Sequence, residues 1–415
     1  MKIVVAHEGK QHSFQTAKAL QKRSMLLAYI TTVYDKKGSF THVLKNFLHG
    51  NAKKKCSSRR DHEIDDSKVV QYCELKGLLL LLIQRVPVLK RLIPSYYRSL
   101  HDDFGVHVAK YAISNKADAV IMYDTNANAC FKYLKDHAPD ITRILDVTIG
   151  NRLFLKKIYQ DDMDKYPCTA SLLQEEQREV FDTRNQARLK EEIDLSNYFL
   201  AGSSFVKHSL EYSGVDATRI FVVNYGVNLK QFTAEDKQYD KGPLRLLFTG
   251  NCSYRKGVHH LLAVVSEFSE NEVVLSVAGG YDANSALYKR YSSCSNIDFL
   301  GFVTRDILHK VYQKSDVFVL PSLAEGFAMV SLEAMSAGLP VICTTNSGCN
   351  DIIVDGKNGF VIDVSDENQL KNKIEWFLYN KQSISQMSIE AKKAVSDHSW
   401  DDYGIRLIKT INAIK

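Results

Sequence analysis

AEGFAMVSLEAMSAGLP, residues 324–340, holds two glutamates eight positions apart, Glu325 and Glu333. The preceding run DVFVLPS, residues 316–322, is typical of a buried strand, so we expect a strand, a loop with Glu325 and a helix with Glu333. The first N–H groups of a helix are unpaired and attract phosphate. Gly326 would let the backbone approach a ligand closely. The stretch therefore suits a sugar nucleotide, with phosphate at the helix start, a ribose on Glu333 and a second sugar near Glu325.

The residues around Glu325 and Glu333 are stronger evidence for a binding site than the two glutamates alone, since two solvated glutamates occur eight apart in many helices. Leu-Pro-Ser precedes it at 320–322, and Gly-Leu-Pro-Val-Ile follows at 338–342. The segment resembles the E-x7-E motif of the retaining enzymes of glycosyltransferase family 4, which have the GT-B fold. The resemblance covers the second half of the chain, including Asn-Tyr-Gly-Val-Asn at 224–228, the glycine turn at 355–360 and Trp400 before a last helix. It implies two Rossmann-like parallel-sheet domains that face a cleft, with a C-terminal helix crossing back to the first domain.

The alternation of strand-like and helical runs predicts parallel sheets covered on both faces. The strand-like runs fall in two series, residues 1–7, 26–32, 119–123, 141–147 and 198–201, and then residues 244–250, 273–278, 297–300, 317–320, 340–343 and 359–362. Together with the resemblance, they predict four parts. These are an acceptor-binding domain at 1–232, a linker at 233–243, a donor-binding domain at 244–397, and a returning helix at 398–415.

GNCSYRKG, residues 250–257, joins a strand to a helix and carries two cations. Lys256 could neutralise a diphosphate as the sugar leaves, and family members have a Lys-Gly here that binds the diphosphate. Many members also carry Arg directly after the first glycine, where this chain has Asn251. Either Arg255 supplies the second cation or charge neutralisation is weaker. The alternative interpretation of Lys256 is that it is a surface lysine at a helix start, without a role in binding. Gly279-Gly280 resembles the family's turn near the nucleotide base, although any tight turn would use two glycines.

The N-terminal half carries fewer signals. Asp146 ends a strand where many family members have the active-site histidine. Its carboxylate could bind a donor-sugar hydroxyl or orient the acceptor, or it could cap the following helix. His7 and His12 flank the first loop, and a satisfied structural histidine is more common than a catalytic one. The predicted catalytic residues are Glu325, Lys256 and Asp146, and the predicted donor-binding residues are Gly250, Asn251, Arg255, Gly279, Gly326, Phe327, Ala328, Met329 and Glu333.

Charge is unevenly placed along the 415 residues. Residues 1–100 hold 19 Lys and Arg against 7 Asp and Glu, a net charge of +12, which leaves −6 for the rest of a chain of net +6. Basic residues cluster at 53–55, 59–60 and 85–98, and the last cluster, which includes Lys90 and Arg91, is interleaved with apolar residues. This mixture suits either an amphipathic surface on anionic lipid or a core helix with a solvated basic face. Nucleic acid is not expected as a partner, because no binding motif accompanies the charge.

Composition argues against a membrane-spanning protein, a secreted protein and a protein held by disulfides or zinc. Hydrophobic residues make up 45% and charged residues 25%, as in globular proteins. The eight cysteines show no Cys-x-x-Cys pair, which indicates free thiols rather than zinc or disulfides. The chain begins without a secretory signal, and no apolar run approaches the roughly 20 residues of a spanning helix. We therefore expect a cytoplasmic protein, at the inner membrane face if the basic surface binds lipid.

The sequence as a whole predicts a retaining, metal-independent glycosyltransferase without a cofactor. Its donor would be a nucleoside diphosphate sugar, and its acceptor a hydroxyl of a glycan or lipid-linked intermediate. The acidic run at 161–164 reads as a solvated turn rather than a metal site. Three alternatives stay open. The first is another GT-B enzyme acting on nucleotide sugars, such as an epimerase, and the second is a glycogen or sucrose synthase-like enzyme, which would be longer and richer in motifs. The third is a non-catalytic partner subunit, favoured by Asn251 and Asp146, which depart from the family pattern.

Overall fold

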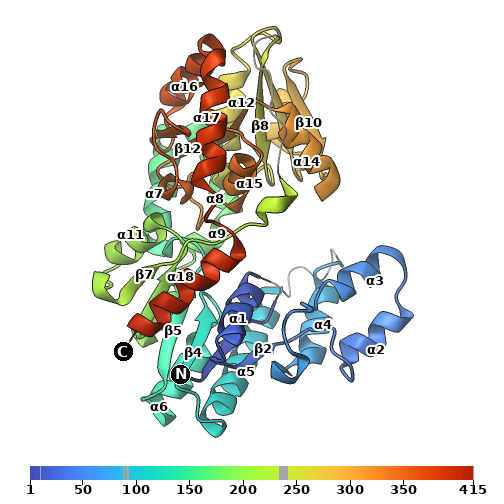
Figure 1. The fold of residues 1–415 in the computed structure, drawn as a ribbon, viewed down its shortest axis with the longest axis vertical. Helices are drawn as coiled ribbons and strands as arrows, with labels where there is room; N and C mark the ends of the chain where they lie inside the picture. Colours follow the sequence, from blue (N-terminus) through green and yellow to red (C-terminus); the bar gives the residue numbers. More distant parts are fainter. Residues whose placement is uncertain (10, 87–88, 90–92, 233–241, 415) are drawn as a thin grey trace.

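Two parallel β-sheets, one above the other in Figure 1, organise the molecule. The structure is a computed structural model, and it describes residues 1–9, 11–86, 89, 93–232 and 242–414. Most of the predicted linker, and Lys90 and Arg91 of the predicted basic surface, lie outside the described residues.

The first sheet has seven strands in the order β3-β2-β1-β4-β5-β6-β7, and neighbouring strands pair in parallel. Its strands are β1 (Ile3–Ala6), β2 (Leu26–Thr31), β3 (Val69–Gln71), β4 (Ala119–Tyr123), β5 (Thr142–Val147), β6 (Tyr198–Ala201) and β7 (Ile220–Val222). The helices between them are α1 (Ser13–Lys22), α2 (Phe40–Phe47), α3 (Gly50–Ser57), α4 (Glu74–Ile83), α5 (Ile93–Ser114), α6 (Asn128–His137), α7 (Arg152–Lys165), α8 (Pro167–Glu176), α9 (Arg178–Phe181), α10 (Thr183–Leu195) and α11 (Ser204–Tyr212).

Alternate residues of β1 face opposite sides of this sheet, as the strand period requires. Ile3 and Val5 pack in one core cluster with α1 and the last helix, whereas Val4 and Ala6 pack in a second cluster with α5 and α6. Because both faces are covered, the strands are apolar without alternation, which is typical of parallel sheets.

The second sheet has six parallel strands in the order β10-β9-β8-β11-β12-β13. Its strands are β8 (Leu244–Thr249), β9 (Val273–Ala278), β10 (Ile297–Gly301), β11 (Val317–Leu320), β12 (Val341–Thr344) and β13 (Gly359–Ile362). Its helices are α12 (Val258–Val265), α13 (Ala286–Tyr291), α14 (Arg305–Lys314), α15 (Met329–Ser336), α16 (Glu367–Tyr379) and α17 (Lys381–Ala394). The predicted pair of parallel-sheet α/β domains is therefore confirmed.

The last helix, α18 (Trp400–Ala413), crosses back and packs on α1 of the first domain (Figure 1). The hydroxyl groups of Tyr403 and Thr16 form a hydrogen bond of 2.8 Å in the buried interface. A Cβ on Gly404 would lie 3.1 Å from Cβ of Ala19, so the two helices approach closely there. The predicted return of the C-terminal helix to the first domain is confirmed.

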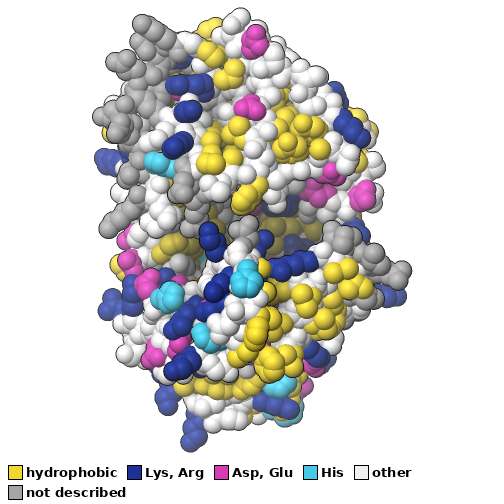
Figure 2. Space-filling view, turned by 90° about the vertical axis from the view of Figure 1, so that its right-hand side faces the viewer, with side chains coloured by type: hydrophobic (Ala, Val, Ile, Leu, Met, Phe, Trp, Pro, Cys, Tyr) yellow, Lys and Arg dark blue, Asp and Glu magenta, His cyan; other side chains and the backbone are white. Residues whose placement is uncertain are grey.

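The surface around α2, α3 and α4 carries both apolar and basic side chains. Figure 2, which faces this side of the molecule, shows hydrophobic side chains beside many Lys and Arg over the lower half, and a hollow between the two halves. Large apolar side chains are exposed on α2 and α4, namely Phe40, Val43, Leu44, Phe47, Leu75, Leu79 and Leu82. Within the described part of the chain, none of the helices has the length and apolar content needed to cross a membrane.

Candidate functional site

Glu325 lies between two cations that follow a neighbouring strand. It sits in the loop between β11 and α15, while Arg255 and Lys256 form a short 3-10 turn, η5 (Tyr254–Lys256), after β8. Oε1 of Glu325 is 2.9 Å from Nζ of Lys256, and Oε2 is 3.1 Å from Nη1 of Arg255. Since β8 and β11 are adjacent and parallel, their carboxyl ends meet at one edge of the sheet, which is where open α/β sheets bind ligands.

Charge decides the ionisation of Glu325. Burial alone would raise the pKa of its carboxyl, but the nearby Lys256 and then Arg255 outweigh burial and lower the pKa below 4.5. Glu325 is therefore an anion at neutral pH. Its Oε1 is ion-paired with Lys256, although no hydrogen bond from a described residue reaches it with good geometry. A carboxylate oxygen has more than one lone pair, so Oε1 can also accept from a ligand hydroxyl.

Glycines let the loops of this edge come together. A Cβ on Gly257, whose φ is +63°, would lie 1.8 Å from the carbonyl oxygen of Pro321. A Cβ on Gly279 would lie 1.9 Å from the carbonyl oxygen of Gly250. The Lys256 side chain packs against Gly250, since a Cβ there would lie 3.1 Å from Nζ of Lys256. The predicted residues Gly250, Lys256 and Gly279 are thus neighbours. Asn251 is exposed beside them, and Arg255 rather than Asn251 contacts Glu325.

Gly326 meets the first domain. A Cβ at this position would lie 1.7 Å from the carbonyl oxygen of Thr148, in the loop after β5, so only glycine fits the contact. The buried hydroxyl of Ser203 donates to the Gly326 carbonyl at 2.6 Å. The close approach expected of Gly326 is therefore made to the backbone of the other domain. The Glu325 loop consequently lies at the junction of the two domains.

Asp146 lies on the first-domain side of this junction. Its two oxygens contact the hydroxyl of Tyr225 and Nε2 of His12, each at 3.1 Å, and the carboxylate is buried. The Tyr225 ring packs edge-on against Phe327, with centroids 5.9 Å apart, which links Asp146 to the Glu325 loop. The alternative that Asp146 caps the next helix is wrong, because Asn151 caps α7 by accepting from the Leu153 N–H.

The predicted phosphate and ribose contacts lie at the start of α15. The N–H groups of Ala328 and Met329 donate within the protein, to Ser347 at 3.2 Å and to Phe327 at 2.9 Å. Glu333 is half-buried, and one of its oxygens lies 3.3 Å from the hydroxyl of Tyr312. A phosphate at this helix start would therefore have to replace bonds that Ala328 and Met329 already make.

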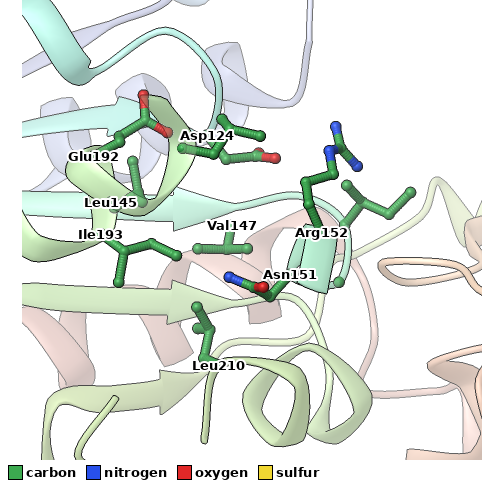
Figure 3. Close-up of a pocket in the computed structure, with 11 residues that line it drawn as sticks. Asp124, Leu145, Val147, Asn151, Arg152, Glu192, Ile193 and Leu210 are labelled. Carbon is green, nitrogen blue, oxygen red and sulfur yellow. The ribbon is translucent and has the colours of Figure 1, made fainter. Parts of the chain in front are cut away.

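A pocket in the first domain adjoins the Thr148 loop. Figure 3 shows Asp124, Asn151, Arg152 and Glu192 among aliphatic residues that line it. Asp124 accepts hydrogen bonds from both the N–H and the hydroxyl of Thr148, at 2.9 and 2.6 Å, and burial raises the pKa of its carboxyl. Burial likewise raises the pKa of Glu192 to about 8. The pocket wall therefore holds the loop that Gly326 contacts.

Two groups of residues were not found from the sequence. Glu176 of α8 accepts from the N–H groups of Tyr254 and Arg255, at 2.8 and 3.1 Å, and so holds η5.

The prediction that residues 161–164 form a solvated turn is wrong, because they lie inside α7 and Asp162 is buried against α12. The apolar spacing Leu155, Ile158, Met163 on that helix was the available signal, since it places Asp162 on the buried side.

Comparison with known proteins gives a family match for the second domain. Residues 230–394 match the family model described as Glycosyl transferases group 1. An uncharacterized glycosyltransferase of Methanocaldococcus jannaschii is 27% identical over 212 residues, which is 50% of this chain and 56% of that protein. The sulfoquinovosyl transferase of Arabidopsis thaliana is 28% identical over 158 residues, 37% of this chain and 30% of that protein. The chain thus spans about half the length, or less, of the curated relatives it matches.

Solved structures resemble the whole chain. Sucrose-phosphate synthase from Thermosynechococcus elongatus aligns with a TM-score of 0.67 at 15% identity, covering 100% of this chain and 99% of that one. The Anabaena protein HepE in complex with UDP aligns with a TM-score of 0.63 at 14% identity, covering 100% of both chains. Identities this low bear on the fold alone. The chain has the GT-B fold, and its residues 230–394 are similar to the group 1 glycosyl transferases.

Proposed function

We propose that this chain is a retaining glycosyltransferase, as its resemblance to glycosyltransferase family 4 implies, and that its donor is a nucleoside diphosphate sugar. The observation that carries the proposal is the ion-paired group of Glu325, Lys256 and Arg255 at the junction of the two domains. Support for the donor class comes from HepE, a neighbour in fold whose structures hold UDP and UDP-glucose.

The proposed reaction exchanges one C–O bond for another. The acceptor hydroxyl attacks the anomeric carbon on the face from which the diphosphate departs, and its proton passes to the leaving phosphate. Lys256 and Arg255 neutralise the charge that develops on the diphosphate, which is a large term in such reactions. Glu325 binds donor-sugar hydroxyls through the remaining lone pairs of its carboxylate, and Glu333 binds the ribose. Two cations supply this neutralisation, so we propose that the step needs no metal.

Arg255 is the proposed replacement for the arginine that many family members carry at the position of Asn251. Its guanidinium reaches Glu325 and also donates to the carbonyl of Ala324 at 2.7 Å, which fixes its orientation. The proximity of Glu325 keeps the pKa of Arg255 raised despite burial. This placement favours a catalytic chain over a non-catalytic partner subunit.

The first experiment is thermal stabilisation by UDP, GDP, ADP, dTDP and their sugars, with and without Mg²⁺. We expect a selective rise in melting temperature for one nucleoside diphosphate, by mass action on the folded state. The same shift without Mg²⁺ would support metal independence. No shift with any nucleotide would overturn the donor proposal and favour the partner subunit.

Glu325→Gln is the variant that tests the assigned centre. It keeps the shape of the side chain but removes the charge between Lys256 and Arg255, so we expect transfer to fall at least about 100-fold, as for lost electrostatic stabilisation elsewhere. Glu270→Gln, at an exposed glutamate, is the matched control and should transfer normally. Normal transfer by Glu325→Gln would remove Glu325 from the proposed mechanism.

We also propose that the acceptor is presented at an anionic membrane surface. The exposed apolar faces of α2 and α4 lie in the basic part of the chain, and Phe47 is 74% exposed. Apolar and basic side chains together favour anionic lipid. In vesicle sedimentation, Phe47→Asp should weaken binding to phosphatidylglycerol vesicles at least about tenfold, since burying one such side chain contributes ~1.5–3 kcal/mol. Phe302→Asp, also at an exposed phenylalanine, should not. Equal binding by both variants would contradict this surface.

A further inference from the structure

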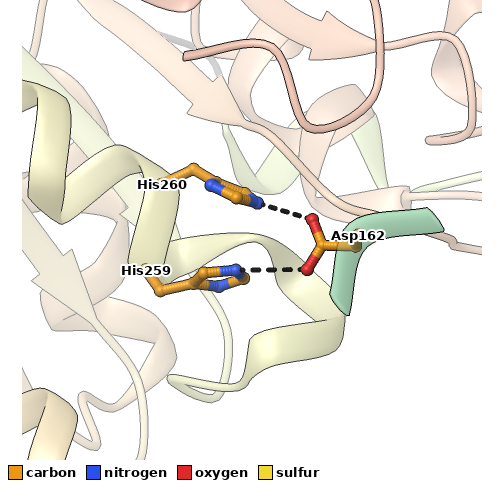
Figure 4. A group of neighbouring side chains, drawn as sticks. All are labelled: Asp162, His259 and His260. Carbon is orange, nitrogen blue, oxygen red and sulfur yellow. Dashed lines mark hydrogen bonds and ion pairs between the residues drawn. The ribbon is translucent and has the colours of Figure 1, made fainter. Parts of the chain in front are cut away.

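We propose that Asp162, His259 and His260 form a binding site for a divalent cation of the zinc class, which would tie α7 to α12. The three residues come from distant parts of the chain. Asp162 lies on α7, whereas His259 and His260 are consecutive residues in the first turn of α12. Figure 4 shows both imidazole rings directed at the two oxygens of the Asp162 carboxylate.

The spacing of the donor atoms fits a metal ion. Nε2 of His260 is 2.9 Å from Oδ1 of Asp162, and Nε2 of His259 is 3.7 Å from Oδ2. One donor atom from each residue lies within 4.8 Å of the others. Tetrahedral zinc with bonds of about 2.0–2.2 Å needs donor atoms about 3.3 Å apart. Only small movements would therefore be required. Two imidazoles and one carboxylate are ligands that suit zinc and similar cations.

Unpaired atoms inside this cluster point to a missing ligand. Oδ2 of Asp162 and both ring nitrogens of His259 are buried without a hydrogen-bond partner among the described residues. The side chain of His259 is only 6% exposed, and that of Asp162 is 0% exposed. Buried polar groups are nearly always paired, because leaving them unpaired costs free energy. A cation between Oδ2 of Asp162 and Nε2 of His259 would give both of these atoms a partner.

A plain ion pair explains only half of the cluster. Nδ1 of His260 lies 2.7 Å from a Glu367 oxygen, so a His260 imidazolium could bridge Asp162 and Glu367 without a metal. That arrangement leaves His259 with the long 3.7 Å contact to Oδ2 of Asp162 and no hydrogen bond from its ring nitrogens to a described residue. With a metal on Nε2, the same Glu367 contact becomes the carboxylate support that metal-bound histidines usually have. Ser365 also donates to Oδ1 of Asp162 and so holds the carboxylate in place.

The position of the cluster indicates a structural rather than a catalytic cation. His259 follows Lys256 by three residues, and η5 leads directly into α12. A metal bridging α7 and α12 would fix the start of α12 and thereby the turn that carries Lys256. This inference does not rest on the proposed glycosyl transfer, and its test uses no activity measurement.

The test is zinc binding by the whole chain after removal of metal with a chelator. We expect about one Zn²⁺ per chain by elemental analysis after desalting, and a rise in melting temperature on adding Zn²⁺. His259→Gln and Asp162→Asn should lose the bound metal and the thermal shift. His208→Gln, at an exposed histidine, is the control and should keep both.

The outcomes separate cleanly. An equal zinc effect in wild type, His208→Gln and His259→Gln would show binding elsewhere and overturn the proposal, as would no bound zinc in the wild type. If Asp162→Asn fails to fold, His259→Gln still decides, because His259 loses only a long 3.7 Å ion pair and no hydrogen bond to a described residue.

Discussion

At the scale of single residues, Glu325 lies in a charged group that joins distant parts of the chain. The loop places its carboxylate between Lys256 and Arg255, which belong to a turn some 70 residues earlier in the chain. In this structure both cations are paired with Glu325. A diphosphate would therefore bind beside an existing anion, and the two cations must serve both charges.

Sequence motifs and the family resemblance singled out Gly250, Lys256, Gly279 and Glu325 at the ends of strands. The structure brings these residues together, and their roles stay predictions. Tyr225, by contrast, was not predicted to contact Asp146. Such partners come from distant segments, and only the packing of the first sheet reveals them.

His7 predicts a pH dependence at the scale of one residue. Burial lowers the pKa of its imidazole to about 4 from 6.5. The unfolded chain therefore takes up this proton at a higher pH than the folded chain does. The free energy of unfolding should thus fall as pH drops from about 6.5 to about 4, by about 3 kcal/mol from this group. Above pH 6.5 His7 contributes no further change.

Denaturation at pH 7 and pH 4.5 would check this prediction. His7→Asn removes the titrating group, so the variant should lose less stability between the two pH values than wild type. His137→Asn, at an exposed histidine, should lose as much as wild type does. A pH dependence unchanged in His7→Asn would mean that other groups account for acid destabilisation.

At the scale of elements, long buried strands were easier to predict than the short edge strand β3 and the acidic end of helix α7. The runs at 119–123 and 317–320 coincide with β4 and β11, because buried parallel strands are continuous apolar segments. The edge strand β3 was missed, since three residues are too few to show a pattern. Helix α7 was misread at its acidic end, where a charged run hides a buried residue.

Helix α18 depends on how it starts. Ser399 and Asp402 form a capping box, in which Asp402 N–H donates to the Ser399 hydroxyl and Asp402 accepts from the Ser399 N–H. The segment just before it is held by the first domain, because the Val227 N–H donates to the carbonyl of His398 at 2.9 Å. The cap therefore lies where the chain enters the first domain.

Ser399→Ala should cost about 1 kcal/mol of stability, the usual effect of losing a serine cap. The loss should appear in chemical denaturation as a lower midpoint. Ser396→Ala is the control, since the Ser396 hydroxyl donates to the nearby carbonyl of Lys393 and Ser396 is not the N-cap of any helix in the described part of the chain. Equal midpoints for the two variants would show that docking on α1, and not the cap, holds α18.

At the scale of the molecule, the two domains share one core. A single cluster of buried side chains runs from β1 and α1 of the first domain through Tyr403 and Leu407 of α18 to the strands of the second. The Glu325 loop adds a polar contact between domains through Gly326. The resemblance predicted the returning helix, but the individual contacts between the domains, such as that of Ser203 with Gly326, could not be predicted because they join distant segments.

Gly326→Ala tests whether the Thr148 contact holds the domains together. The added Cβ would lie 1.7 Å from the backbone oxygen of Thr148, so the Glu325 loop or the Thr148 backbone must move. We expect a larger radius of gyration by X-ray scattering and a turnover reduced about 100-fold, since small misplacements of reacting groups cost that much. Gly105→Ala is the matched control, because its Cβ would lie 2.9 Å from the Cys130 nitrogen inside the first domain. It should lower the melting temperature without changing the radius. If Gly326→Ala behaves like Gly105→Ala, the contact stabilises a loop but does not set the distance between the domains.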